Sequence, residues 1–168
     1  EQYKVRSSLY LKLIRRFCNK RIRNMKVLDL GCLEGGISIE LARAGAKTTG
    51  IDIRQQNIDK ALFASNILGC GKRCNWLVGD VTNKNCFDQL NVRKFDIIIL
   101  SGLLYHIDSP EIMPLLRNLG NHCSKKGLLI VDTNITRQTT DTYKVDSTLT
   151  IHGKKWKEHE PSDSEQVR

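Results

Sequence analysis

Carboxylates flank a glycine-rich turn near the start of the chain. The run Val27 to Leu30 is a short apolar strand that carries Asp29, and Gly31, Cys32, Leu33, Glu34 and Gly35 follow it. Such a turn usually holds phosphate through its backbone N–H groups. Phosphate beside Asp29 and Glu34 would be repelled, which argues against a dinucleotide. A ligand that has a cationic end and no phosphate fits these residues better.

S-adenosylmethionine has that chemistry, because it carries a sulfonium, an ammonium, a carboxylate and an adenosine. Acidic residues at the turn can receive the ammonium, directly or through water, and free backbone amides can receive the carboxylate. The turn therefore predicts S-adenosylmethionine as cofactor, with S-adenosylhomocysteine as product.

Polar residues at the ends of later apolar runs extend this site. Asp52 lies 23 residues after Asp29, where an acidic side chain accepts ribose hydroxyls. Asp80 is placed to take the adenine amino group, and the amide of Val81 to reach a ring nitrogen. Ser101 and Gly102 are small enough to let the backbone pass close to the methionine portion. Ile53, Asn57 and Gly79 complete the predicted cofactor residues.

His106 and Tyr105 are the candidates for acceptor chemistry. They follow the fourth apolar run, near the place where a methyl acceptor would lie. An imidazole that titrates near neutral pH suits a general base, and Tyr105 can position the acceptor. The alternative for His106 is a purely structural role, packing against or capping the next helix.

Five apolar strands must hold these residues in place, and helical stretches separate them. The strands are expected at 26–30, 47–53, 75–79, 95–101 and 127–132, and the helices at 35–44, 55–68, 84–90 and 109–123. Strands that are apolar on both faces belong between layers of helices. The alternation predicts a doubly wound α/β fold with a mostly parallel sheet.

A basic helix leads the chain. Residues 1–26 contain nine basic residues and one acidic residue, so this segment carries +8 of the chain's net charge of +9. An apolar stripe (Val5, Leu9, Tyr10, Leu13, Ile14 and Phe17) is expected to cover the core. The basic face is either simply solvated or binds an acidic partner, such as RNA, an anionic small molecule or a membrane surface.

The remaining composition narrows the class of protein. Six cysteines lie scattered, and Cys70 and Cys74 lack two further nearby ligands, so we expect neither disulfides nor a metal site. No apolar run is long enough for a membrane span, and we expect a cytoplasmic protein. Residues 134–168 form a polar tail, with a hairpin expected around His152 and Gly153 and disorder from residue 160.

Residues 24 to 133 resemble the class I S-adenosylmethionine-dependent methyltransferases. The stretch 27–35 is similar to the first motif of that family, 50–52 to its ribose motif, 79–81 to its adenine motif and 95–100 to its fourth strand. Leu33 replaces the glycine of most members, which is expected to narrow the pocket. The family usually has seven strands, and only five are clear here. The tail is either a divergent remnant of the last two strands or the end of a fragment cut before them, and we expect a fragment.

The resemblance implies methyl transfer to an acceptor that the sequence does not identify. Residues 103–110 resemble both small-molecule methyltransferases and enzymes that carboxymethylate wobble uridine in tRNA, and we expect a small molecule in preference to RNA. The alternatives are a non-catalytic cofactor-binding or scaffold domain, and an RNA-modifying or RNA-binding module. The expected domains are the helix of residues 1–24, the core of residues 25–133 and the tail of residues 134–168.

Overall fold

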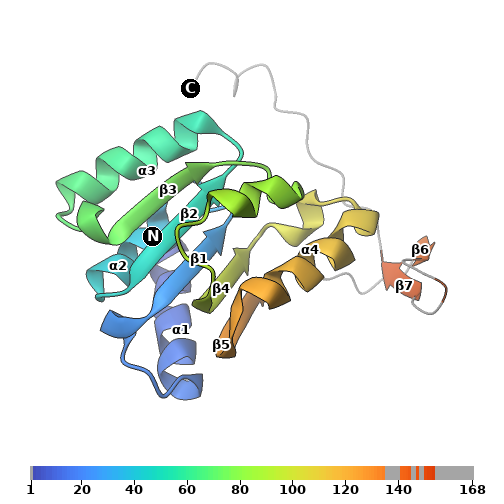
Figure 1. The fold of residues 1–168 in the computed structure, drawn as a ribbon, viewed down its shortest axis with the longest axis horizontal. Helices are drawn as coiled ribbons and strands as arrows, with labels where there is room; N and C mark the ends of the chain where they lie inside the picture. The colour runs from blue at the N-terminus through green and yellow to red at the C-terminus, as the bar shows by residue number, and fades with distance from the viewer. Residues whose placement is uncertain (1, 135–140, 145–146, 148–149, 154–168) are drawn as a thin grey trace. The chain divides into compact units, whose positions relative to one another are not determined.

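Five parallel strands form the central sheet of the computed structural model, which describes residues 2–134, 141–144, 147 and 150–153. Their order across the sheet is β3-β2-β1-β4-β5 (Figure 1). The strands are β1 (Lys26–Leu30), β2 (Lys47–Asp52), β3 (Cys74–Val78), β4 (Phe95–Ser101) and β5 (Cys123–Asp132). The predicted α/β sheet is confirmed, and the order reverses between β1 and β4.

Helices cover both faces of this sheet. Three lie on one face, namely α1 (Gln2–Phe17), α2 (Gly36–Arg43) and α3 (Gln55–Ile67). The other face carries α4 (Ser109–His122) and the short 3-10 helix η3 (Lys84–Gln89). Three more 3-10 turns complete the order: η1 (Ile22–Asn24), η2 (Gly71–Arg73) and η4 (Leu104–His106).

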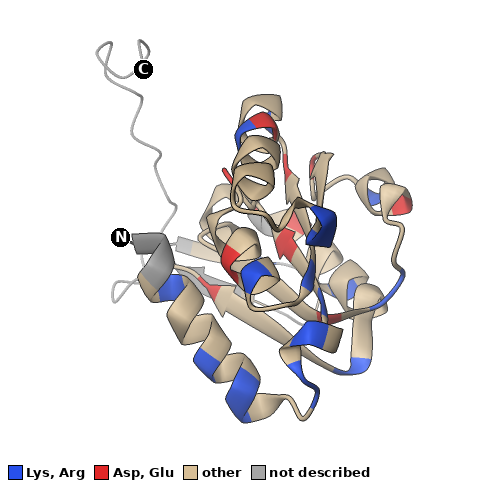
Figure 2. Ribbon diagram, turned by 90° about the vertical axis from the view of Figure 1, so that its left-hand side faces the viewer, with Lys and Arg blue, Asp and Glu red and all other residues tan. Residues whose placement is uncertain are grey.

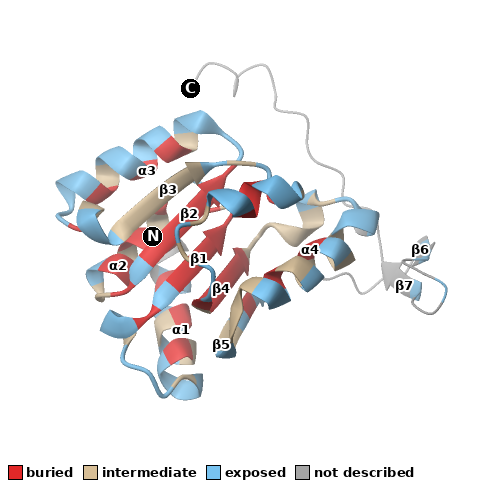
Figure 3. Ribbon diagram, in the orientation of Figure 1, coloured by how far each residue is buried: buried red, intermediate tan, exposed pale blue. Residues whose placement is uncertain are grey.

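The neighbouring strands β1 and β4 in the middle of the sheet are buried on both faces, as Figure 3 shows. Alternate residues of β4 enter opposite halves of the core: Ile98 and Leu100 pack with α4 residues, whereas Ile97 and Ile99 pack with residues of α1 and α2. All four are fully buried. This burial explains why the run is apolar without alternation.

The expected apolar stripe of α1 is only partly correct. Tyr10 and Ile14 are buried, but Val5, Leu9 and Phe17 are 71%, 52% and 62% exposed. A helix turns by about 100° per residue, so Val5 and Leu9 lie on the side opposite to the buried pair. Only the narrow face that meets α2 and β5 is covered.

Residues 134–168 form a second unit, separate from residues 1–133. It contains an antiparallel pair, β6 (Asp141–Lys144) and β7 (Thr150–Gly153). A hairpin exists as expected, but His152 and Gly153 lie inside β7, and residues 145–149 connect the strands. The turn was misplaced because a His-Gly pair fits a strand end as well as a turn. The disorder expected from residue 160 lies outside the described residues.

Candidate functional site

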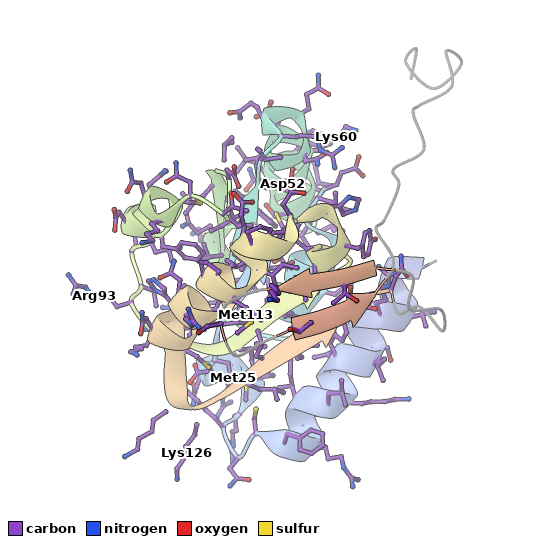
Figure 4. All side chains as sticks on the ribbon, turned by 90° about the vertical axis from the view of Figure 1, so that its right-hand side faces the viewer. Met25, Asp52, Lys60, Arg93, Met113 and Lys126 are labelled. Carbon is purple, nitrogen blue, oxygen red and sulfur yellow. The ribbon has the colours of Figure 1, made fainter. Side chains whose placement is uncertain are left out.

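The polar residues meet at one edge of the sheet, where all five strands end. Parallel strands bring their carboxyl ends together, and ligands of doubly wound sheets bind there, at the point where the strand order reverses. Asp52 closes β2 at this edge, whereas Met25 lies just before β1 at the opposite edge (Figure 4). The order places the end of β1 between those of β2 and β4.

The turn after β1 has a left-handed backbone at three residues. Gly31, Leu33 and Gly35 have φ values of 66°, 50° and 78°. A methyl group on Gly35 would collide with the Trp76 ring and lie 2.9 Å from Cβ of Ala61. The glycine therefore lets the turn pass close to β3 and α3.

Several amides of this turn already have partners within the protein. The N–H of Cys32 donates to the carbonyl of Ile51 at 3.0 Å, that of Gly35 to the carbonyl of Cys32 at 2.9 Å, and that of Leu33 to Asp52 at 3.0 Å. These three amides are therefore not among the free amides that could receive a carboxylate, and the predicted role of free amides in the turn stays a prediction. The glycine spacing alone does not tell which amides the fold itself uses.

Asp29 is a buried carboxyl group. It is 1% exposed, and the Ser38 hydroxyl on α2 donates to its Oδ2 at 2.8 Å. Burial raises its pKa to about 7, an effect that the nearby charge of Asp52 reinforces and the Ser38 hydrogen bonds oppose. The hydrogen bond between Asp29 and Ser38 thus joins β1 to α2.

Asp52 is held by three donors. Its Oδ2 accepts from the Leu33 N–H, and its Oδ1 accepts from the N–H of Arg54 and from Nδ2 of Asn57, at 3.0 and 2.9 Å. Only 4% of the residue is exposed. A carboxylate has about four lone-pair sites, so one remains for a ligand hydroxyl. The predicted residues Asp52, Leu33 and Asn57 are brought together here, while the side chain of Ile53 is exposed.

The side chain of Glu34 forms an ion pair with α3. Its Oε1 is 2.7 Å from Nζ of Lys60 on α3, and both side chains are more than half exposed. A hollow of about 500 Å³ lined by Glu34, Lys60, Phe63 and others flanks the pair.

The loop after β3 presents an oriented carboxylate. Asp80 is exposed, and its Oδ1 accepts from the N–H and the hydroxyl of Thr82 at 2.9 and 2.8 Å. These bonds leave Oδ2 available to a ligand. Val81 is buried, and Gly79 lies close to Cys86, which would be 2.5 Å from an added Cβ.

The end of β4 brings together the two residues predicted for acceptor chemistry. The rings of Tyr105 and His106 lie 4.3 Å apart in a tilted arrangement, with His106 exposed. Gly102 has a φ of 68°, and the Tyr105 hydroxyl is 3.2 Å from the position of a Cβ on it. The two rings therefore lie beside the end of β4.

Three residues near this site were missed by the sequence interpretation. The Tyr10 hydroxyl on α1 donates to Oγ of Ser101 at 2.9 Å and lies 3.3 Å from Oδ2 of Asp132. Nε of Arg6 is 3.4 Å from the same Oδ2. Asp132 ends the fifth strand, as Asp52 ends the second, which was the available signal. Nothing in the sequence indicated that α1 reaches this edge.

The thiol of Cys32 is buried beneath the turn. Burial raises its pKa, and the charges of Asp29 and Asp52 add to the effect. A thiol held in its neutral form is a poor nucleophile or metal ligand. Across the described ranges, no group of three or more His, Cys, Asp or Glu side chains is arranged to hold a metal ion. Within those ranges, no helix is long and apolar enough to cross a bilayer.

Curated proteins with similar sequences are methyltransferases. The chain is 29% identical over 116 residues to the ubiquinone biosynthesis O-methyltransferase of Rickettsia bellii, covering 67% of this chain and 43% of that protein. It is 26% identical over 133 residues to the protein of the same name from Pelagibacter ubique, covering 79% and 48%. The chain thus spans less than half the length of these relatives.

Solved structures share the fold. The PH0226 protein from Pyrococcus horikoshii has a TM-score of 0.67 at 24% identity, covering 82% of this chain and 57% of that one. Magnesium protoporphyrin IX methyltransferase from Synechocystis, solved with bound SAH, has a TM-score of 0.59 at 23% identity, covering 73% and 52%.

A family model described as a methyltransferase domain matches residues 2–160. The match includes the strands of the central sheet and the turn after β1. It also includes Asp52, Asp80 and Asp132, which lie at or just after the ends of β2, β3 and β5. The chain belongs to this family of methyltransferase domains.

Proposed function

We propose that the chain is an S-adenosylmethionine-dependent methyltransferase domain that acts on a small molecule. The observation that carries this proposal is the Asp52 carboxylate, fixed by three hydrogen bonds beside the turn after β1. An oriented acceptor of this kind suits ribose hydroxyls, and Asp80 provides a second one for the adenine amino group. These two hydrogen-bond acceptors suit an adenosine without phosphates.

The cofactor supplies an activated methyl group, so the protein has to align the acceptor and remove its proton. His106 is the proposed base, and Tyr105 the residue that positions the acceptor. Both follow β4, beside the end of β1. The named relatives are O-methyltransferases, which favours an oxygen nucleophile.

Calorimetry with S-adenosylmethionine and S-adenosylhomocysteine tests the cofactor. We expect micromolar binding by the wild type and a loss of at least about tenfold in Asp52→Ala. Asp59→Ala is the matched control, because Asp59 is an exposed carboxylate on α3 that bonds only to Gln55 among the described residues. If the folded wild type binds neither compound, the proposal fails.

A methyl-transfer assay separates an enzyme from a non-catalytic domain. Labelled S-adenosylmethionine would be offered with a small phenol such as catechol, and His106→Ala compared with the wild type. We expect turnover that falls by about a hundredfold in the variant while cofactor affinity is unchanged. Binding without turnover on any acceptor would favour a cofactor-binding scaffold.

RNA binding through α1 is a second candidate, because part of its charge has no counter-ion. Figure 2 shows basic residues along this helix. Lys12, Arg15 and Arg16 are exposed, and in the part of the chain that is described no carboxylate lies within ion-pair distance of them. Such a face suits a polyanion.

Fluorescence anisotropy with single-stranded RNA tests this second candidate. We expect binding that weakens steeply with salt, with a slope that falls by about 0.7 for each of Lys12, Arg15 and Arg16 changed to Gln. The pair Lys125→Gln and Lys126→Gln, exposed on β5, is the control. If the α1 substitutions and the β5 substitutions weakened RNA binding equally, the binding would be nonspecific electrostatic attraction and α1 would not be an RNA site.

A further inference from the structure

The outer face of α3 carries large apolar side chains that the described part of the chain leaves uncovered. Phe63 is 69% exposed and Ile67 is 71% exposed. Both lie opposite the buried residues Ile58, Ala61 and Ser65, because a helix turns by about 100° per residue. Figure 3 shows the exposed outer side of this helix. Apolar side chains four residues apart on a helix lie next to each other, so the two form one patch.

A hollow of about 500 Å³ lies beside this patch on the same helix. It is lined by Glu34, Asp59, Lys60, Phe63 and Ala64. Ile67 is not part of this lining and follows Phe63 by about one helical turn. The face of α3 therefore presents a projecting apolar side chain and a recess about one turn apart.

A two-fold axis at Phe63 would join these two features. Two copies of α3 that run antiparallel about such an axis place Phe63 opposite itself. Ile67 comes four residues after the axis and Asp59 four residues before it, so Ile67 of each copy lies opposite Asp59 of the other. Because Asp59 lines the hollow, Ile67 of one copy is directed at the hollow of the other. The residue on the axis is apolar, so no charge on this face meets its own copy.

The unpaired charges at the two ends of α3 also suit an antiparallel second copy. Asp59 accepts a hydrogen bond from Gln55, and among the described residues it has no ion pair. Lys72 is exposed just after the C-terminal end of the helix, and it too has no ion pair in the described part of the chain. Antiparallel packing brings the C-terminal end of one helix toward the first half of the other. Each carboxylate thereby gains an ammonium group nearby.

We propose that the outer face of α3 is the interface of a symmetric dimer of this chain, with Phe63 on the two-fold axis and Ile67 in the hollow of the second copy. A 13-residue helix is about 20 Å long and about 10 Å across, so its face offers less than the roughly 800 Å² per partner of a standard stable interface. We therefore expect a weak dimer, with a dissociation constant of about 10–100 μM. Asp52 and Asp80, which carry the proposed function, lie outside this face, and the inference does not rest on that function.

Sedimentation velocity of the full chain over a range of concentrations tests the dimer. We expect the wild type to be monomeric at about 1 μM and mostly dimeric at about 1 mM. Phe63→Glu places two like charges opposite each other on the axis and should raise the dissociation constant by at least about tenfold. Leu9→Glu is the matched control, because it puts the same charge at an exposed apolar residue of α1 and should leave dimerisation unchanged. Circular dichroism checks that both variants are folded.

A charge reversal tests the antiparallel arrangement. Asp59→Lys should weaken the dimer by about threefold to tenfold, and adding Lys72→Glu should restore the affinity, because opposite charges again face each other. A wild type that stays monomeric at about 1 mM, or a Phe63→Glu variant that dimerises like the wild type, would overturn the proposal. Assemblies larger than two copies would also overturn it, since a two-fold contact closes on itself. Failure of Lys72→Glu to restore the affinity would contradict the antiparallel arrangement.

Discussion

The backbone N–H of Leu33 donates to Oδ2 of Asp52 at 3.0 Å and joins the turn after β1 to the end of β2. Leu33 makes this bond with a φ of 50°. A left-handed conformation costs a residue with a side chain about 1–2 kcal/mol. Asp52, the residue predicted to bind the ribose, thus also holds a strained turn in place. This strain can be measured as a change in the free energy of unfolding.

Substitutions at Leu33 should separate this strain from packing. Leu33→Gly removes the left-handed cost but makes the unfolded chain more flexible, so we expect the free energy of unfolding to change by less than about 1 kcal/mol. Leu33→Val should lower it by about 1–2 kcal/mol, because a β-branched residue tolerates this φ poorly. Urea denaturation measures both variants. A more stable Leu33→Val protein would contradict the interpretation.

Gly50 in the middle of β2 is required for packing. A methyl group there would lie 2.5 Å from Cζ3 of Trp76 and 2.8 Å from Sγ of Cys32. We expect Gly50→Ala to lower the free energy of unfolding by about 2–3 kcal/mol, because both neighbours must shift. Thermal and urea denaturation would show the loss.

Gly120→Ala is the control for Gly50→Ala and is expected to change stability in the opposite direction. Gly120 lies in α4, and no atom is within 4 Å of an added Cβ. Alanine favours a helix by about 0.8–1 kcal/mol over glycine, so this variant should be more stable than the wild type. Destabilisation by both substitutions to the same extent would refute the steric explanation for Gly50.

The buried Asp29 makes stability depend on pH. Its pKa is raised to about 7 from 3.8 by burial. Between about pH 4 and pH 7 the unfolded chain releases this proton and the folded chain keeps it, so the contribution of Asp29 to stability falls as the pH rises. The difference in pKa corresponds to about 4 kcal/mol as an upper bound.

Asp29→Asn tests this dependence, since an amide oxygen can still accept from Ser38. We expect the free energies of unfolding of wild type and variant to be similar near pH 4 and to diverge in favour of the variant toward pH 8. Urea denaturation at a series of pH values measures the difference. Parallel curves over this range would show that Asp29 is ionised in the folded protein.

Tyr10 should anchor α1 through its hydroxyl. Tyr10→Phe keeps the buried ring but removes the donor to Ser101, and we expect a loss of about 1–2 kcal/mol. Hydrogen exchange of α1 amides should accelerate in the variant while exchange in β1 and β4 is little changed. Leu9→Ala, a change of an exposed residue on the same helix, is the control and should leave exchange unaltered.

The sequence by itself determined the α/β sheet, the strand ranges to within a few residues and the aspartates at the strand ends. Apolar runs bounded by glycine and aspartate are local signals, and a parallel sheet needs such runs in the order observed. The strand β5 begins earlier than expected, at Cys123, because a lysine-containing start is not an apolar pattern.

Only the tertiary structure decided which polar groups face a ligand. The sequence shows which glycines and carboxylates the turn contains but not what they bind. In the folded protein, contacts between elements pair Asp29 with Ser38, Glu34 with Lys60 and the amide of Leu33 with Asp52. The approach of α1 to Asp132 joins residues more than 120 positions apart. No periodicity in a helix reports such a contact, because it depends on how the helix packs against strands that come much later in the chain.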